Sequence, residues 1–279
     1  MEKQIINGLK MLLMRVLVNK YTFIVFAAIS LSFNIAASEP IAYLNTLGYE
    51  PAQKNLAVSE NGMVTTQHFL ATSVGEKILT NGGNAYDASI AIAFTLAVVL
   101  PRAGNIGGGG FMVMYDGVSE KAYSIDYREK APALSTKDMY INQDGSFNDK
   151  QLSTFGYTAS GVPGTVAGLW EVHKKFGSLP WDILIKDAIE YAENGFLITP
   201  YMADVLFTYN EKLSYFDETK EIFQKDYPNF KNKRLFQKDL ARTLKIISKK
   251  GRDGFYKGEI AEKIDLDMRK NGGLISKTD

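Results

Sequence analysis

The chain has 279 residues, a net charge of +1 at neutral pH and no cysteine. This length suffices for one large domain or two small ones, and the near-neutral charge gives no indication of nucleic-acid binding. The lack of cysteine excludes disulfides, a thiol nucleophile and thiolate zinc sites, and with only two histidines, His68 and His173, a histidine-rich metal site is excluded as well.

The N-terminal segment has the pattern of an export signal. Basic residues precede the apolar run YTFIVFAAISLSF, and small residues follow it in NIAASEP. The pattern predicts a signal peptide over residues 1–38, cleaved near Ala37 or Ser38, and a periplasmic or secreted mature protein. The alternative is a membrane anchor, but the apolar run falls short of the ~20 residues that a spanning helix needs.

Two helices are predicted next. The first pattern begins at Thr72 and ends at the NGG of residues 81–83, which tolerate left-handed backbone conformations. Asn84 is placed to cap the second helix, AYDASIAIAFTLAVVL, which ends at Pro101. Because this second helix is rich in alanine and apolar on nearly all faces, it is predicted to be a buried central helix.

A glycine-rich segment follows, in which five of the seven residues from Gly104 to Gly110 are glycine. A Walker loop would end in Gly-Lys-Ser/Thr, and a dinucleotide-binding loop would follow a strand and precede a helix. Here a helix precedes the glycines and a strand follows them. Two interpretations stay open: a tight helix-to-strand turn, which we favour, or backbone amides that line a substrate pocket.

The runs FMVMY and KAYSIDY predict a β-hairpin around DGVSE, and Arg128 comes directly after it. An arginine at this place either forms a surface ion pair or grips a substrate carboxylate through two hydrogen bonds. In TTQH, at residues 65–68, a hydroxyl nucleophile beside a histidine base is conceivable. Residues so close in sequence seldom face each other usefully, so a structural role is favoured there.

The rest of the chain reads as a polar loop at 135–155 followed by helices. ASGVPGTVAGLWEVHKKFG is a turn that leads into a helix ending at Gly177, and PWDILIKDAIEYAENGF is a helix that ends at Gly195. Residues 200–270 are mainly helical, with a break at KKGRDGFYKG. Together these elements predict an α+β chain with its strands early and its helices late.

Four motifs, in this order, resemble those of γ-glutamyltransferase, also called glutathione hydrolase: GGNAYDA, GNIGGGGF, REKAP and SGVPGTVAG. The resemblance extends from about residue 55 to residue 279. It implies the αββα sandwich of the N-terminal-nucleophile hydrolases, incomplete here without a small subunit. It also implies transfer of the γ-glutamyl group from glutathione to water or another amine, through a γ-glutamyl-enzyme ester.

The same resemblance implies how the chain is divided. Residues 39–279 correspond to the N-terminal, large-subunit part, truncated at the C-terminus, so the nucleophilic threonine is expected beyond residue 279. No catalytic residue is therefore expected within the chain. Thr65 and Thr66 are not the nucleophile, because TTQH precedes FLATSVGEKIL as in the large subunit's opening segment. The site residue that carries over is Arg128, the arginine of REKAP, which is expected to hold the α-carboxylate of the γ-glutamyl group.

The resemblance implies two partners, a small subunit from the same self-cleaving precursor and a small γ-glutamyl substrate such as glutathione. No metal, other cofactor or nucleic acid is expected, and membrane contact is expected only through an uncleaved signal segment. Two alternatives stay open: a non-catalytic secreted fragment or glutamyl-binding scaffold, and an amidohydrolase like cephalosporin acylase. Because about half of the sandwich is expected to be missing, the helix at 85–100 is expected to expose apolar surface.

Overall fold

The computed structural model describes residues 58–148 and 152–279, so the predicted signal peptide lies outside the described residues. The chain divides into two compact units. One comprises Val58–Leu197 and Asn232–Asp279, and the other includes Ile198–Lys231. In the described part of the chain, no helix is long and apolar enough to cross a membrane.

The larger unit begins with α3 (Phe69–Thr80) and α4 (Ala85–Val99). The helix α3 starts three residues before the predicted Thr72, because the imidazole Nδ1 of His68 accepts a hydrogen bond from the backbone N–H of Leu70 and caps it. Asn84 caps α4 as predicted, and the two side chains of a capping box are both in place.

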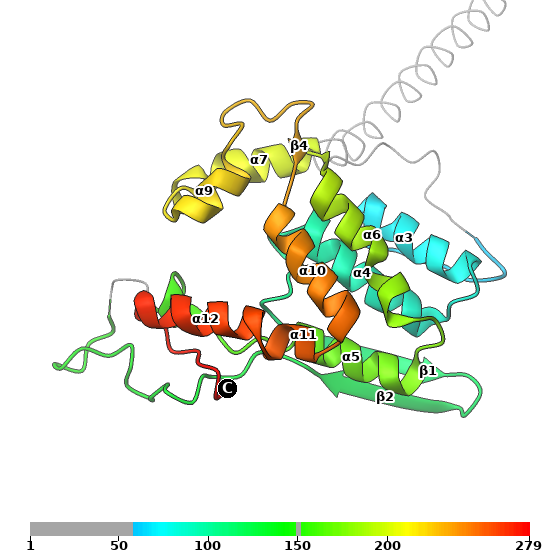
Figure 1. Ribbon diagram of the computed structural model, residues 1–279, viewed down its shortest axis with the longest axis horizontal. Helices are drawn as coiled ribbons and strands as arrows, with labels where there is room; N and C mark the ends of the chain where they lie inside the picture. Colours follow the sequence, from blue (N-terminus) through cyan, green and yellow to red (C-terminus); the bar gives the residue numbers. More distant parts are fainter. Residues whose placement is uncertain (1–57, 149–151) are drawn as a thin grey trace, which may run out of the picture. The chain divides into compact units, whose positions relative to one another are not determined.

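The helix α4 is the centre of this unit and packs against α3, α5 and α6 (Figure 1). Ile90, Ala91 and Phe94 are fully buried within it. The prediction of a buried central helix is therefore confirmed. The expectation that α4 would expose apolar surface holds only in part. Neighbouring helices of the same chain cover most of α4, whereas Ile92, Ala93 and Leu96 stay partly exposed.

The predicted hairpin consists of β1 (Phe111–Asp116) and β2 (Lys121–Asp126), paired antiparallel so that Phe111 faces Asp126. On one face Met114 is buried, and Tyr123 lies 5.1 Å from the ring of Phe176 in α5. On the other face Phe111, Val113 and Tyr115 are 64%, 83% and 66% exposed. The exposed apolar surface of this unit thus includes a face of the hairpin. We call these three side chains the hairpin face.

Helices form most of the remainder of the larger unit. After the 3-10 turn η1 (Tyr157–Ala159) come α5 (Thr165–Phe176), α6 (Trp181–Asn194), α10 (Lys238–Lys250), α11 (Asp253–Tyr256) and α12 (Glu259–Lys270). A short antiparallel pair, β3 (Phe196–Leu197) and β4 (Arg234–Leu235), joins the chain on either side of the second unit. In Figure 1, α6 lies beside both α4 and α10.

The predicted breaks between helices coincide with glycines in the left-handed region. Gly195 follows α6 with a φ of 69°, and Gly251 and Gly258 flank α11 with φ values of 60° and 65°. These last two glycines belong to the KKGRDGFYKG break. The described residues of the 135–155 segment form turns and a single bridge between Ile141 and Phe147, as expected of a loop.

The second unit contains α7 (Pro200–Thr208), α8 (Asn210–Leu213) and α9 (Asp217–Phe223). Thr199 caps α7 through the backbone N–H of Met202, and Pro200 occupies the first helical position, where a missing N–H costs nothing. The prediction of a mainly helical 200–270 region is confirmed.

Candidate functional site

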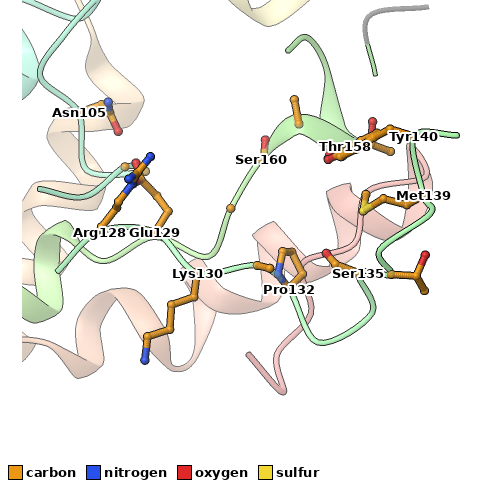
Figure 2. Close-up of a pocket in the computed structure, with 16 residues that line it drawn as sticks. Asn105, Arg128, Glu129, Lys130, Pro132, Ser135, Met139, Tyr140, Thr158 and Ser160 are labelled. Carbon is orange, nitrogen blue, oxygen red and sulfur yellow. The ribbon is translucent and has the colours of Figure 1, made fainter. Parts of the chain in front are cut away.

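A pocket of about 640 Å³ lies in the larger unit, between the segment that follows β2 and the segment around η1 (Figure 2). This volume is in the range of small-molecule sites. Arg128 and Glu129 stand on one side of the opening in Figure 2, with Asn105 beside them. Its hydroxyl-bearing lining residues are Ser135, Thr136, Tyr140, Thr158 and Ser160.

Arg128 reaches this pocket because two backbone anchors flank it. Before it, Tyr127 exchanges hydrogen bonds with Gly110, at N···O distances of 3.0 and 3.4 Å. After it, Lys130 exchanges hydrogen bonds with Val162, at 3.4 and 2.8 Å. The predicted site residue therefore sits in a short span held at both ends, with its side chain exposed to the pocket.

The guanidinium of Arg128 is not part of a surface ion pair in the described chain. Asp126 and Glu129 are its acidic neighbours in sequence, but the Asp126 carboxylate accepts a hydrogen bond from the backbone N–H of Arg128 instead, at 2.9 Å. Within residues 58–148 and 152–279 the guanidinium forms no ion pair or hydrogen bond. A planar, permanently charged donor group therefore lines the pocket, and it has no protein acceptor among the described residues.

The glycine-rich segment serves the turn that we favoured and also borders the pocket. A Cβ on Gly104 would lie 2.6 Å from the carbonyl oxygen of Leu96, so only glycine permits this close return over the end of α4. The carbonyl oxygen of Gly108 accepts hydrogen bonds from the backbone N–H groups of Gly164, at 2.7 Å, and Thr165, at 3.0 Å. Gly107 and Gly108 also line the pocket, while the distances at Gly104 support the turn.

Sequence reasoning missed Tyr256, which ties α11 to the turn of SGVPGTVAG. Its hydroxyl donates a hydrogen bond to the carbonyl oxygen of Pro163, at 2.8 Å, and accepts one from the backbone N–H of Ala167, at 3.3 Å. Burial raises the pKa of the Tyr256 hydroxyl above its ordinary value. The only sequence signal was the aromatic pair within GFYKG, which by itself indicates no partner.

The TTQH residues form a helix cap and do not line the pocket. The hydroxyl of Thr66 donates to the carbonyl oxygen of His68, at 2.8 Å, and lies 2.9 Å from the hydroxyl of Thr72. Burial lowers the pKa of the His68 imidazole to about 4. Its Nδ1 already accepts the capping hydrogen bond of α3, so the histidine is not oriented towards a threonine hydroxyl as a base.

His173 likewise has a structural environment. Its Nε2 lies 2.8 Å from the carbonyl oxygen of Leu179, and its ring packs against Trp170 and Trp181, at 5.9 and 5.2 Å between centroids. Among the described residues there is no group of acidic and histidine side chains that could hold a metal ion.

Known proteins are similar to this chain in sequence and in fold. A model of the gamma-glutamyltranspeptidase family matches residues 71–279. The chain is 46% identical over 233 residues to a glutathione hydrolase proenzyme of Pseudomonas sp. (strain A14), covering 79% of this chain and 38% of that protein. It is 42% identical over 257 residues to the glutathione hydrolase proenzyme of Pseudomonas aeruginosa, covering 92% of this chain and 43% of that protein. The chain thus spans about two fifths of the length of these curated relatives.

Solved structures agree with the sequence comparison. The gamma-glutamyltranspeptidase of Helicobacter pylori has a TM-score of 0.77 and 43% identity, covering 80% of this chain and 64% of that one. The cephalosporin acylase of Bacillus halodurans has a TM-score of 0.68 and 25% identity, covering 82% of this chain and 44% of that one. The predicted fold class, part of an N-terminal-nucleophile hydrolase, is confirmed by these neighbours. The chain belongs to the gamma-glutamyltranspeptidase family.

Proposed function

We propose that this chain supplies the large-subunit part of an enzyme that transfers γ-glutamyl groups. The donors are glutathione and related γ-glutamyl compounds, and the acceptors are water or the amino groups of amino acids and peptides. The observation that carries the proposal is Arg128, the arginine of the family motif REKAP, which borders a pocket with its guanidinium unpaired within the described residues. Family membership and the proenzyme names of the relatives support it.

The role of Arg128 is to hold the α-carboxylate of the donor. Its planar fork can form two parallel, charge-assisted hydrogen bonds with a carboxylate, which fixes direction as well as distance. The pocket offers room for the rest of a small γ-glutamyl compound beside it. Holding the α-carboxylate places the γ-carbonyl at a defined distance from Arg128, where a nucleophile supplied by another segment can attack it.

That nucleophile is a threonine beyond residue 279, on a small subunit made from the same precursor. Its hydroxyl attacks the γ-carbonyl carbon, with its own α-amine taking the proton, and the amine of the leaving group departs with a proton. Backbone N–H groups of the small subunit stabilise the oxyanion that forms. Water or an amine then attacks the γ-glutamyl ester, and the threonine is regenerated.

The same proposal includes the location of the enzyme. Residues 1–38 act as a signal peptide, and residues 39–279 are delivered to the periplasm or the exterior. The supporting observation is the basic and apolar pattern of the N-terminal sequence, followed by small residues. Detection of a mature N-terminus near Ala37 or Ser38 by sequencing of the exported protein would test this part directly.

The catalytic proposal is tested by expressing this chain with the small subunit of a related glutathione hydrolase and measuring release of p-nitroaniline from L-γ-glutamyl-p-nitroanilide. We expect turnover with both parts and none with this chain alone. Binding of L-glutamate without turnover in the combined protein would favour the glutamyl-binding scaffold. Preferential cleavage of a cephalosporin side-chain amide would favour the acylase alternative, to which the structural neighbour from Bacillus halodurans points.

A further inference from the structure

We propose that Tyr127 is a positioning residue for substrate binding. Its ring occupies a slot formed by glycines of two other segments and so fixes the place from which Arg128 reaches the pocket. The inference rests on the proposed function, because it requires that Arg128 holds the donor's α-carboxylate.

The slot exists because the glycines that line it have no side chains. A Cβ on Gly110, directly before β1, would lie 2.9 Å from Cε2 of the Tyr127 ring and 3.0 Å from its hydroxyl oxygen. A Cβ on Gly168, in the middle of α5, would lie 2.7 Å from Cδ1 of the same ring. These distances are shorter than real Cβ contacts. The ring therefore lies where two side chains would otherwise stand, and it is half-buried there.

Glycines also lie close to the backbone around Tyr127, as close as those that lie against its ring. A Cβ on Gly109 would lie 2.8 Å from the Cα of Arg128 and the backbone nitrogen of Glu129. A Cβ on Gly164, in the SGVPGTVAG turn, would overlap the carbonyl oxygen of Tyr127. The glycines of two separate family motifs thus meet at one residue, and that residue immediately precedes the proposed carboxylate-binding arginine.

Arg128 needs such a support because nothing else in the described chain holds its side chain. It has several rotatable bonds, forms no ion pair or hydrogen bond through its guanidinium there, and is exposed. Its position is set by the backbone, which is fixed on one side by Tyr127 and on the other by the pairing of Lys130 with Val162. A displacement of about 1 Å at a substrate-positioning group can cost on the order of 10²-fold in rate.

The test uses the combined enzyme described above and L-γ-glutamyl-p-nitroanilide. In Tyr127→Ala the slot is empty, and kcat/KM is expected to fall roughly 10- to 100-fold, mostly through a higher KM. Tyr127→Phe is expected to restore most of the loss, because the Tyr127 hydroxyl forms no hydrogen bond with the described residues and the ring alone fills the slot. A KM in Tyr127→Ala equal to that of the wild type would overturn the inference.

A double-mutant cycle separates positioning from general damage. If Tyr127 acts through Arg128, adding Tyr127→Ala to Arg128→Ala should lower kcat/KM by less than about 3-fold further. If Tyr127 only stabilises the fold, its full loss should appear again in the Arg128→Ala background, and the inference is wrong. If Arg128→Ala itself leaves KM unchanged, the proposed function fails at this residue, which is a different outcome from a silent Tyr127→Ala.

A second pair of variants covers the case in which Tyr127→Ala does not fold. Gly168→Ala places a methyl group against the ring and should raise KM, whereas Gly117→Ala, in the hairpin turn with no atom within 4 Å of the new Cβ, should not. Equal KM values for Gly168→Ala and Gly117→Ala would contradict the slot.

Discussion

At the scale of single residues, Arg128 is the position where the proposed function can be tested most directly. Truncating one partner of a desolvated charge pair typically costs ~2–5 kcal/mol, so Arg128→Ala should lower kcat/KM by roughly 30-fold to several thousand-fold. KM should rise most, because the carboxylate is held in the ground state and the transition state alike. Steady-state kinetics with L-γ-glutamyl-p-nitroanilide in the combined enzyme measures both constants.

Arg128→Lys is the matched control for charge. Lysine keeps the positive charge but loses the planar fork, so it should recover only part of the lost affinity. Cleavage of the precursor should be much less affected in either variant, because no free α-carboxylate takes part in it. Near wild-type KM in both variants would show that Arg128 is an ordinary surface residue, whose effect on stability is small.

His68 gives a prediction for pH. Its pKa is lowered by burial from 6.5 to about 4, so the folded chain keeps the imidazole neutral where the unfolded chain binds a proton. The stability that it contributes is therefore fully present above pH ~6.5 and is lost as the pH falls from there towards 4. Urea unfolding of this chain at pH 7 and pH 5 should show the decrease.

The control for His68 is asparagine, which caps helices well and does not titrate. The variant His68→Asn should keep a capped α3 and lose part of the difference in unfolding free energy between pH 7 and pH 5. The exposed carboxylates whose pKa values are lowered, such as those of Asp116 and Asp253, lose their contribution at still lower pH, so they affect both proteins alike. The same pH dependence in His68→Asn and the wild type would mean that His68 binds its proton equally well in the folded and the unfolded chain.

At the scale of secondary-structure elements, local signals located most of the helices. The cap at Asn84, the stop at Gly195 and the break at KKGRDGFYKG mark real ends, because a cap or a left-handed glycine acts within a few residues of itself. Gly177 also follows the end of α5, but in an extended conformation with a φ of −67°. The pattern predicts the start of α3 three residues late, because the capping acceptor is an imidazole nitrogen and not the side-chain oxygen of serine, threonine, aspartate or asparagine.

Contacts between distant elements could not be predicted from the residues alone. The pairing of Tyr127 with Gly168, and of Tyr256 with the SGVPGTVAG turn, joins segments that are far apart in sequence, and no periodicity encodes it. The resemblance to a family pointed to Arg128, but the reason for the clustered glycines around it became apparent only from their distances to the 127–129 backbone.

Asp87 links two elements and gives a prediction for stability. This fully buried carboxylate, in the first turn of α4, accepts hydrogen bonds from the backbone N–H of Asn84, at 3.0 Å, and from the backbone N–H and hydroxyl of Ser178, before α6. Asp87→Ala removes the acceptor of these partly buried hydrogen bonds and one half of the capping box of α4, so it should lower the free energy of unfolding by about 1–3 kcal/mol.

The measurement for Asp87 is the urea midpoint of the chain, at constant m-value. Glu76 lies in α3 on an exposed surface, and Glu76→Ala is a matched loss of a carboxylate that should change the midpoint little. The urea midpoint of Asp87→Asn should fall between those of the two alanine variants. Asparagine keeps one acceptor oxygen, but its amide group is a donor that faces the donors of Asn84 and Ser178. Equal midpoints for Asp87→Ala and Glu76→Ala would show that the link between α4 and α6 carries no stability.

At the scale of the whole molecule, the fold class was predictable because the four motifs are specific, while the distribution of exposed surface was not. The apolar composition of the 85–100 segment predicted burial, and the expected loss of half the sandwich predicted exposure of the same helix. Packing against α3, α5 and α6 buries most of this helix, and only Ala85, Ile92, Ala93 and Leu96 keep apolar surface exposed or partly exposed. The hairpin carries the exposed apolar face instead, because in the described chain β1 and β2 form a sheet of two strands.

The last prediction concerns this hairpin face. Residues 39–279, expressed alone, should bind a hydrophobic dye such as ANS through Phe111, Val113 and Tyr115, since adjacent exposed apolar side chains form a patch. The double variant Phe111→Lys and Val113→Lys should lose much of the dye signal without lowering the urea midpoint, because both side chains already face solvent. Val118→Lys removes a similar side chain, 96% exposed, from the hairpin turn outside the patch, and should leave the signal nearly unchanged.

Dye binding that survives the double variant would place the accessible apolar surface outside the hairpin face. A drop in the urea midpoint of the double variant would show that the hairpin face stabilises the fold of the chain on its own. If supplying the small subunit also removes the dye signal of the wild-type chain, the small subunit covers this face in the combined protein.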